Sequence, residues 1–202
     1  MEKRRVGLYG GTFNPPHVGH VGAAEAFCRE ISLDKLIIMP DYLPPHKDIK
    51  GDVSASDRLN MARLAFGHID NAVISDMEIK REGRSYTSVT LEELSSPGEE
   101  IYFLCGTDML LTLSEWYRPE VIFRLATICF VRRENDRDTT LLIEGKIKEY
   151  ERKYSARIIH IPTDVKVVSS SELRSALENG ERLEELLPYR VLDYINEKRL
   201  YK

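Results

Sequence analysis

Residues 4–20 read RRVGLYGGTFNPPHVGH, and the rest of the chain is organised around this stretch. The apolar residues 6–9 indicate a short buried strand, and Gly10 and Gly11 follow it directly. Because glycine has no Cβ, the backbone at these two residues can turn sharply and approach a ligand closely. Residues 14–16, an asparagine and two prolines, then hold an extended turn. The pattern therefore predicts a strand, a tight turn and the start of a helix.

Two histidines, His17 and His20, stand where the apolar spacing of residues 18–31 predicts the helix to begin. Their spacing places both on one side of the first turn, where unpaired N–H groups and the helix dipole favour an anion. This arrangement suits a phosphate site, and a purely structural turn is the alternative. A zinc site is less favoured, because no nearby cysteine or acidic cluster completes the ligands.

The composition is that of one globular domain, expected to span residues 1–202. The chain has 29 basic and 33 acidic residues, which argues against general nucleic-acid binding. Cys28, Cys105 and Cys129 lie in apolar runs and are expected to be buried reduced thiols, as is typical of the cytoplasm. No signal-peptide or membrane-spanning segment is apparent, so we expect a cytoplasmic protein without a membrane partner.

Strands alternate with helices along the chain, which predicts an α/β protein with a doubly wound parallel sheet. After the first strand, further strands are expected at 35–39, 72–74, 101–105, 127–131 and 157–161. Residues 78–85 are charged and are expected to be irregular. Ligands on such sheets bind beyond the carboxyl ends of the strands. The segments that follow strands are therefore expected to form one composite site, and they are 10–11, 40–47, 106–108 and 169–174.

Two of these segments carry cations suited to phosphate. Residues 169–171 are three serines that open a helix, and Arg174 follows one turn later. Simple helix capping explains the serines, whereas a guanidinium beside free N–H groups would also grip a polyphosphate. Lys47 is either a solvated loop lysine or a cation that neutralises a transferring phosphate.

Other polar and aromatic residues suit the remainder of a nucleotide. Asp108 either caps a short helix or accepts hydrogen bonds from ribose hydroxyls. The indole of Trp116 is either core or a surface for a pyridinium ring. Tyr86 and Thr87 begin a helix that offers N–H groups to a small carboxylate. The Gly-x-Gly-x-x-Gly fingerprint, the P-loop motif and the Gly-x-Ser-x-Gly elbow are all absent, which disfavours dehydrogenases, P-loop enzymes and serine hydrolases.

Residues 10–20 (GGTFNPPHVGH) resemble the first signature of the nucleotidyltransferase superfamily with the His-x-Gly-His motif, and residues 168–174 (VSSSELR) resemble its second. Within it the chain is similar, over nearly its whole length, to the bacterial nicotinate-nucleotide adenylyltransferases. This resemblance implies a Rossmann-like nucleotidyltransferase fold with a small C-terminal helical region. It also implies transfer of AMP from ATP to nicotinate mononucleotide in NAD biosynthesis. The products are nicotinate adenine dinucleotide (deamido-NAD) and pyrophosphate, and Mg²⁺ is bound mainly through the ATP phosphates.

The resemblance also implies roles for particular residues. The implied catalytic residues are His17, His20, Lys47 and Arg174. The implied ATP-binding residues are Gly10, Gly11, Thr12, Phe13, His17, His20, Gly106, Asp108, Ser169, Ser170, Ser171 and Arg174. The implied nicotinate mononucleotide-binding residues are Gly11, Thr12, Lys47, Tyr86, Thr87, Trp116 and Tyr117. No residue is expected to bind a metal directly, and a homo-oligomer is compatible with the resemblance.

Two positions depart from the family pattern. Asn14 stands where aspartate is more usual, and residues 132–135 (RREN) replace a commoner Arg-Pro-Gly run, which leaves Arg133 without an implied role. The alternative substrates are nicotinamide mononucleotide and phosphopantetheine, although enzymes acting on the latter usually carry threonine at the position of His17. A non-catalytic nucleotide-sensing module is a further alternative, and it would bind ATP without releasing pyrophosphate.

Overall fold

The computed structural model describes residues 3–45, 53–132, 136–163 and 168–202. The strands are β1 (Arg4–Gly11), β2 (Lys35–Pro40), β3 (Ala72–Ile74), β4 (Glu99–Gly106), β5 (Ala126–Val131) and β6 (Ile158–His160). They form one sheet in the order β3-β2-β1-β4-β5-β6, which is the strand order of a doubly wound fold. The pairs β1–β4, β4–β5 and β5–β6 are parallel, so the predicted α/β class is confirmed.

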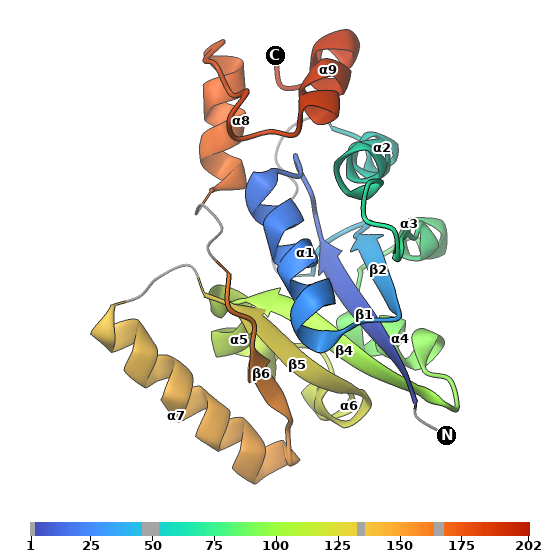
Figure 1. Cartoon of the computed structure of the whole chain (residues 1–202), viewed down its shortest axis with the longest axis vertical. Helices are drawn as coiled ribbons and strands as arrows, with labels where there is room; N and C mark the ends of the chain where they lie inside the picture. The colour runs from blue at the N-terminus through green and yellow to red at the C-terminus, as the bar shows by residue number, and fades with distance from the viewer. Residues whose placement is uncertain (1–2, 46–52, 133–135, 164–167) are drawn as a thin grey trace. The chain divides into compact units, whose positions relative to one another are not determined.

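Helices lie between successive strands, as the alternating pattern predicts, and two further helices follow β6 (Figure 1). They are α1 (Val18–Ile31), α2 (Ala55–Phe66), α3 (Met77–Arg81), α4 (Thr87–Leu94), α5 (Thr107–Thr112), α6 (Pro119–Leu125), α7 (Arg137–Tyr154), α8 (Ser170–Glu178) and α9 (Tyr189–Lys198), with a short 3₁₀ helix η1 (Leu113–Glu115). The last two helices are the predicted small C-terminal helical region.

The chain divides into two compact units. The first unit contains Met1–Tyr9, Ala26–Leu36 and Tyr86–Thr163, and the second contains Gly10–Glu25, Ile37–Ser85 and Asp164–Lys202. The expectation of one domain over residues 1–202 stays a prediction.

The core of the first unit is built from β5, whose side chains are almost all buried, and from the second half of β4, where residues 103–105 are buried. Such continuous apolar runs are typical of parallel strands covered on both faces. Gly7 in β1 has a specific packing role, because a Cβ there would lie 2.4 Å from Leu33 Cδ1 and 2.8 Å from Phe27 Cε1. The strand can pack this closely against those side chains only without a Cβ.

The three cysteines are free thiols, and two of them are buried as predicted. Burial raises the pKa of Cys105 well above its ordinary range and the pKa of Cys129 to about 12. Cys28 is only half-buried, so the expectation of burial is wrong for this residue. Among the described residues, no helix has the length and apolar character needed to cross a membrane.

In the second unit, α2 packs against β3 and α9. The N-terminus of α2 is capped by Ser54, whose hydroxyl accepts a hydrogen bond from the Asp57 N–H. From α9, the Tyr194 hydroxyl donates to Asp57 Oδ1 at 2.9 Å, and Asn60 Nδ2 donates to that hydroxyl at 3.2 Å. These contacts join the C-terminal region to the rest of the second unit.

The prediction of irregular structure over residues 78–85 is wrong for 78–81, because residues 77–81 form helix α3, whereas residues 82–85 lie in no helix or strand. Its charges pair locally: Lys80 forms an ion pair with Asp76 at 3.0 Å, and Arg81 lies 3.7 Å from Glu78. These pairs are three and four residues apart, which places the partners on one helix face. A charged run with this spacing supports a helical turn even though it lacks an apolar stripe.

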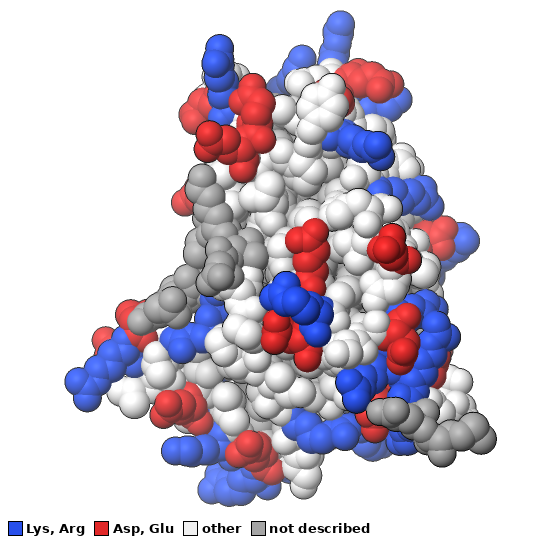
Figure 2. Space-filling model, viewed as in Figure 1, with Lys and Arg blue, Asp and Glu red and all other residues white. Residues whose placement is uncertain are grey.

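Figure 2 shows basic and acidic side chains interspersed over the face in view. With 29 basic and 33 acidic residues in the whole chain, a phosphorylated ligand must be recognised by local groups.

Candidate active site

The loop that precedes α1 turns at the residues that follow the two glycines. Gly10 and Gly11 are the last residues of β1, and the left-handed backbone conformation falls on Phe13, with φ of 48°. The Asn14–Pro15 peptide bond is cis. Proline fixes its own φ and restricts the residue before it, so the prolines set where the chain turns. The sharp turn that the glycines allow is therefore not made at the glycines themselves, and the turn lies at the predicted proline segment.

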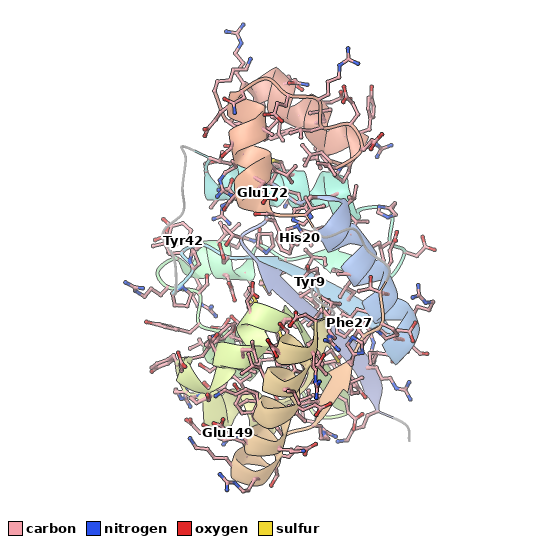
Figure 3. All side chains as sticks on the ribbon, turned by 90° about the vertical axis from the view of Figure 1, so that its left-hand side faces the viewer. Tyr9, His20, Phe27, Tyr42, Glu149 and Glu172 are labelled. Atoms are coloured by element: carbon pink, nitrogen blue, oxygen red, sulfur yellow. The ribbon has the colours of Figure 1, made fainter. Side chains whose placement is uncertain are left out.

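His17 and His20 form a stacked pair at the start of α1, with ring centroids 3.7 Å apart. Each ring accepts the other's backbone N–H at Nδ1, at 3.3 Å in both directions. Because Nδ1 accepts in both rings, each carries its proton on Nε2, which makes Nε2 a hydrogen-bond donor. Figure 3 labels His20 at the N-terminal end of the helix. The pair thus places two imidazoles beside a helix N-terminus, a combination that suits an anion, and the Nε2 atom of His17 is itself buried.

The Phe13 ring packs against the histidine pair through His20. Its side chain is 2% exposed, and its ring makes edge contacts with His20 and Phe66, each with centroids 5.3 Å apart. The side chain is therefore part of the core. Any contact between Phe13 and ATP would have to come from its backbone.

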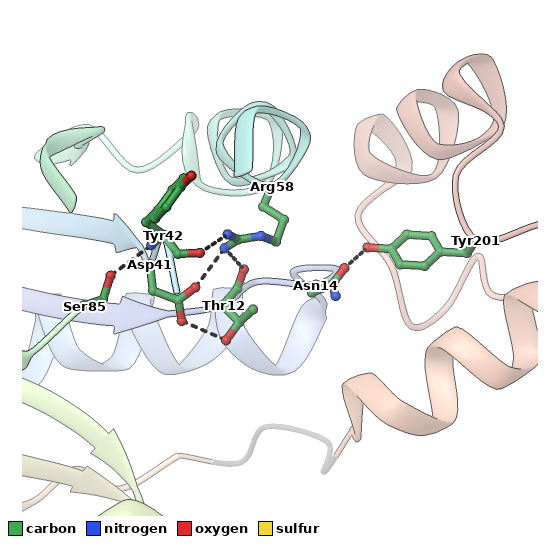
Figure 4. Close-up of polar contacts among 7 residues, drawn as sticks. All are labelled: Thr12, Asn14, Asp41, Tyr42, Arg58, Ser85 and Tyr201. Carbon is green, nitrogen blue, oxygen red and sulfur yellow. Dashed lines mark hydrogen bonds and ion pairs between the residues drawn. The ribbon is translucent and has the colours of Figure 1, made fainter. Parts of the chain in front are cut away.

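A buried ion pair holds the strand end in place (Figure 4). The Arg58 side chain has no exposed surface, and its Nη1 donates to Asp41 Oδ1 and to the Thr12 carbonyl, both at 2.9 Å. Its Nη2 donates to the Tyr42 carbonyl at 3.0 Å. The Thr12 hydroxyl donates to Asp41 Oδ2 at 2.8 Å, so it is committed to this network.

The same network extends to neighbouring backbone. The Asp41 N–H donates to the Gly11 carbonyl at 3.0 Å, and the Tyr42 N–H donates to Ser85 Oγ at 2.9 Å. Burial lowers the pKa of Arg58, while the adjacent Asp41 acts in the opposite direction. The arginine thus tethers the ends of β1 and β2, and it leaves the glycine-rich segment little freedom to move.

Arg174 joins the two predicted phosphate motifs within the second unit. Its Nη1 donates to the Asn14 carbonyl at 2.9 Å, and its Nη2 donates to Ser171 Oγ at 3.0 Å. Ser169 caps α8 by accepting from the Glu172 N–H, and Figure 3 labels Glu172 in the first turn of this helix. Ser169 therefore caps α8, as the capping interpretation predicts. Arg174 is held beside Asn14, which lies three residues before His17.

The first unit brings together two of the predicted nicotinate-binding residues. The rings of Tyr86 and Tyr117 lie with centroids 4.5 Å apart. Tyr86 is the N-cap residue of α4, and Thr87 begins that helix. A bidentate ion pair supports the arrangement, because Arg118 donates to both carboxylate oxygens of Glu92 at 2.8 Å. This pair ties the start of α6 to α4.

The remaining predicted residues of the first unit surround α5. Gly106 is the N-cap residue of α5, and a Cβ there would meet nothing within 4 Å. Asp108 is exposed in the first turn, which leaves its carboxylate accessible. Trp116 is half-buried, and its Nε1 donates to Thr112 Oγ1 at 3.4 Å.

Lys47, an implied catalytic residue, lies outside the described residues, as does Arg133, which has no implied role. Within the described ranges, no cluster of three or more His, Cys, Asp or Glu side chains could hold a metal ion.

Sequence reasoning missed the residues that support the loop, chiefly Arg58, Asp41 and Tyr201. The sequence contained a signal for the burial of Arg58, because this residue shares a helical face with Ala62 and Ala65, which are buried. Asp41 directly follows β2, a position where polar side chains face a site. Nothing local marks Tyr201, whose hydroxyl contacts a residue 187 positions earlier in the chain.

Comparison with known proteins identifies the family of this chain. A family model described as cytidylyltransferase-like matches residues 8–176. A probable nicotinate-nucleotide adenylyltransferase of Lachnoclostridium phytofermentans is 36% identical over 200 residues, which cover 98% of this chain and 99% of that protein. Another, from Listeria monocytogenes serotype 4a, is 33% identical over 201 residues, which cover 98% of each chain.

Solved structures show the same fold. The Plasmodium falciparum nicotinic acid mononucleotide adenylyltransferase complexed with NaAD has a TM-score of 0.73 and 17% identity, and the match covers 98% of this chain and 97% of that one. A putative nicotinate-nucleotide adenylyltransferase from Vibrio parahaemolyticus has a TM-score of 0.67 and 18% identity, covering 98% and 95%. These structural matches confirm the nucleotidyltransferase fold.

Proposed function

The chain belongs to the cytidylyltransferase-like family and, within it, to the nicotinate-nucleotide adenylyltransferases, and we infer that it transfers the adenylyl group of ATP to nicotinate mononucleotide. The observation that carries this inference at the residue level is the stacked pair of His17 and His20, linked through Asn14 to Arg174. Two imidazole donors, a guanidinium and two helix N-termini gather in the second unit, and all of them favour phosphate.

The reaction is a displacement at the α-phosphorus of ATP. A phosphate oxygen of the mononucleotide forms the new bond to this phosphorus, and the bond to the bridging oxygen of the β-phosphate breaks. Pyrophosphate leaves with the bonding electron pair, so no oxidant or covalent enzyme intermediate is needed. Alignment of two bound substrates can supply about 7–11 kcal/mol of barrier reduction in favourable cases.

The residues of the second unit would stabilise the charge that develops during this step. The Nε2 donors of His17 and His20 would contact ATP phosphate oxygens, and Arg174 would accompany the departing pyrophosphate. The serines at the start of α8 would add backbone donors. The backbone of Gly10, Gly11 and Thr12 would line the nucleotide, because the Thr12 hydroxyl is already bonded to Asp41. Lys47 would add a further cation.

Mg²⁺ is proposed to arrive with ATP and to neutralise part of its phosphate charge. Because Mg²⁺ keeps several of its waters and binds phosphate oxygens, it does not require a protein cage of carboxylates.

The aromatic and helix-terminal residues of the first unit suit the nicotinate mononucleotide. The carboxylate would accept hydrogen bonds from the N-terminus of α4 at Thr87, which is an eight-residue helix without a side-chain cap. Trp116, Tyr86 and Tyr117 would contact the pyridinium ring. Gly106 and Asp108 would line the ATP ribose. We place this chemistry in the cytoplasm, where free thiols such as Cys105 and Cys129 stay reduced.

The proposed function is tested by measuring pyrophosphate release from ATP or CTP with each candidate acceptor in the presence of Mg²⁺. The acceptors are nicotinate mononucleotide, nicotinamide mononucleotide and phosphopantetheine. ATP with nicotinate mononucleotide is expected to give the highest kcat/KM. Equal kcat/KM for the two pyridine mononucleotides would contradict carboxylate recognition. ATP binding without pyrophosphate release from any acceptor would indicate a sensing module.

Arg174→Lys is expected to lower kcat/KM for ATP by about tenfold or more, because lysine keeps the charge but loses the two-pronged donor geometry. Arg182→Lys is a matched control, since Arg182 is exposed and lies beyond α8. Steady-state rates with varied ATP measure both variants. Unchanged kcat/KM for Arg174→Lys would remove Arg174 from the proposed phosphate site.

A further inference from the structure

The penultimate residue of the chain contacts the loop that carries the histidines. The Tyr201 hydroxyl donates to Asn14 Oδ1 at 2.6 Å (Figure 4). Tyr201 is 9% exposed, and Asn14 is 4% exposed, so water does not compete freely for this bond. Burial also raises the pKa of the Tyr201 hydroxyl above its usual range, so the hydroxyl stays protonated and can donate.

Asn14 is held from two directions. Tyr201 holds its side chain, and Arg174 donates to its backbone carbonyl at 2.9 Å. Asn14 follows the left-handed residue Phe13 and lies three residues before His17. Its amide group and its peptide unit are thus both fixed. A change in either contact would be transmitted through two prolines to the first histidine.

We propose that Tyr201 is a positioning residue for adenylyl transfer, which orients the Asn14–His17 segment so that His17 meets the ATP phosphates. This proposal rests on the proposed function and assigns a role in it to the C-terminal end of the chain. Tyr201 acts through Asn14 and does not itself touch the substrates. The Tyr201 hydroxyl binds the side chain of Asn14, and the guanidinium of Arg174 binds the backbone carbonyl of the same asparagine.

The structure offers a matched control for the hydroxyl. Tyr194 lies in the same unit, and its hydroxyl also takes part in hydrogen bonds, to Asp57 and from Asn60. These bonds join α9 to α2 and do not involve residues 12–20. Tyr194→Phe should therefore reduce stability by a similar amount without moving the histidine loop.

Tyr201→Phe is expected to lower kcat by about tenfold to a hundredfold, since small misplacements of a catalytic group have effects of this size. The KM for nicotinate mononucleotide should change little, and Tyr194→Phe should keep the kcat of the unchanged protein. Both variants are assayed well below their unfolding temperatures. Equal kcat for the two variants would overturn the positioning role, whatever their stabilities.

Substitutions at the other end of the bond test the same proposal. Asn14→Asp keeps an acceptor for the Tyr201 hydroxyl, whereas Asn14→Leu removes it. We expect Asn14→Leu to lower kcat much more than Asn14→Asp, and we expect Tyr201→Phe to add little further loss in the Asn14→Leu background. Independent, multiplicative losses in the double variant would contradict the coupling.

Hydrogen exchange separates this proposal from the function it rests on. In Tyr201→Phe, amides of residues 17–21 are expected to exchange faster, whereas in Tyr194→Phe their exchange should not change. This readout does not require catalysis. Absence of adenylyl transfer in the unchanged protein would reject the proposed function, whereas unaltered exchange and kcat in Tyr201→Phe would reject only the role of Tyr201.

Discussion

His17→Ala is expected to lower kcat by about a hundredfold to a thousandfold, which is the usual cost of removing one preorganised donor to developing charge. The imidazole is 2% exposed and is fixed by reciprocal backbone bonds with His20, so its Nε2 donor is already oriented before ATP binds. Burst or single-turnover kinetics with nicotinate mononucleotide would measure the effect on the chemical step.

The control for this variant is His68→Ala. His68 is exposed in the second unit, and its Nε2 forms a hydrogen bond with Glu25 Oε1 at 2.9 Å, a contact on the surface of the protein. Its removal should leave kcat unchanged and alter stability only slightly. If His17→Ala retained the kcat of His68→Ala while both remained folded, the phosphate role of the histidine pair would be wrong.

Arg58→Met is expected to reduce the free energy of unfolding by about 3–5 kcal/mol, because it leaves a buried carboxylate without its cationic partner. Asp41 would keep only the Thr12 hydroxyl among these side-chain donors, and the carbonyls of Thr12 and Tyr42 would each lose a donor. Equilibrium unfolding in urea measures the change. Adding Asp41→Asn should recover part of the loss, since it removes the uncompensated charge.

Arg63→Met is the matched control on the same helix. Arg63 is exposed, and its Nη1 donates to Asn60 Oδ1 at 3.1 Å. This variant should change stability by no more than about 0.5 kcal/mol. Similar losses for Arg58→Met and Arg63→Met would contradict the view that the buried ion pair holds the ends of β1 and β2 together.

Much of the fold could be predicted from local patterns. The alternation of apolar strands and amphipathic helices is a short-range signal, and it located β3 at residues 72–74 and α1 at residues 18–31. Helix α3 was not predicted, because its turn is supported by charge pairs instead of an apolar stripe. The glycines after Tyr9 permit a sharp turn but continue β1, and the chain turns at the prolines that follow.

The same difference between local patterns and distant contacts applies to the candidate site. Residues within the two signatures, such as His17 and Arg174, belong to contiguous motifs, so the sequence alone is enough to propose them as site residues. The residues that hold those motifs in place are distant in sequence: Arg58 contacts a carbonyl 46 positions away, and Tyr201 contacts Asn14 across 187 positions. Periodicity and spacing describe neighbours along one element, so they contain no information on such contacts.

This chain is expected to join the adenylyl group of ATP to nicotinate mononucleotide. The most direct measurement follows a radioactive phosphorus label at the α-position of ATP during turnover with nicotinate mononucleotide and Mg²⁺. The label is expected to appear in nicotinate adenine dinucleotide, with one unlabelled pyrophosphate released for each dinucleotide formed. Recovery of the label only in ATP, ADP or AMP would contradict adenylyl transfer to this acceptor.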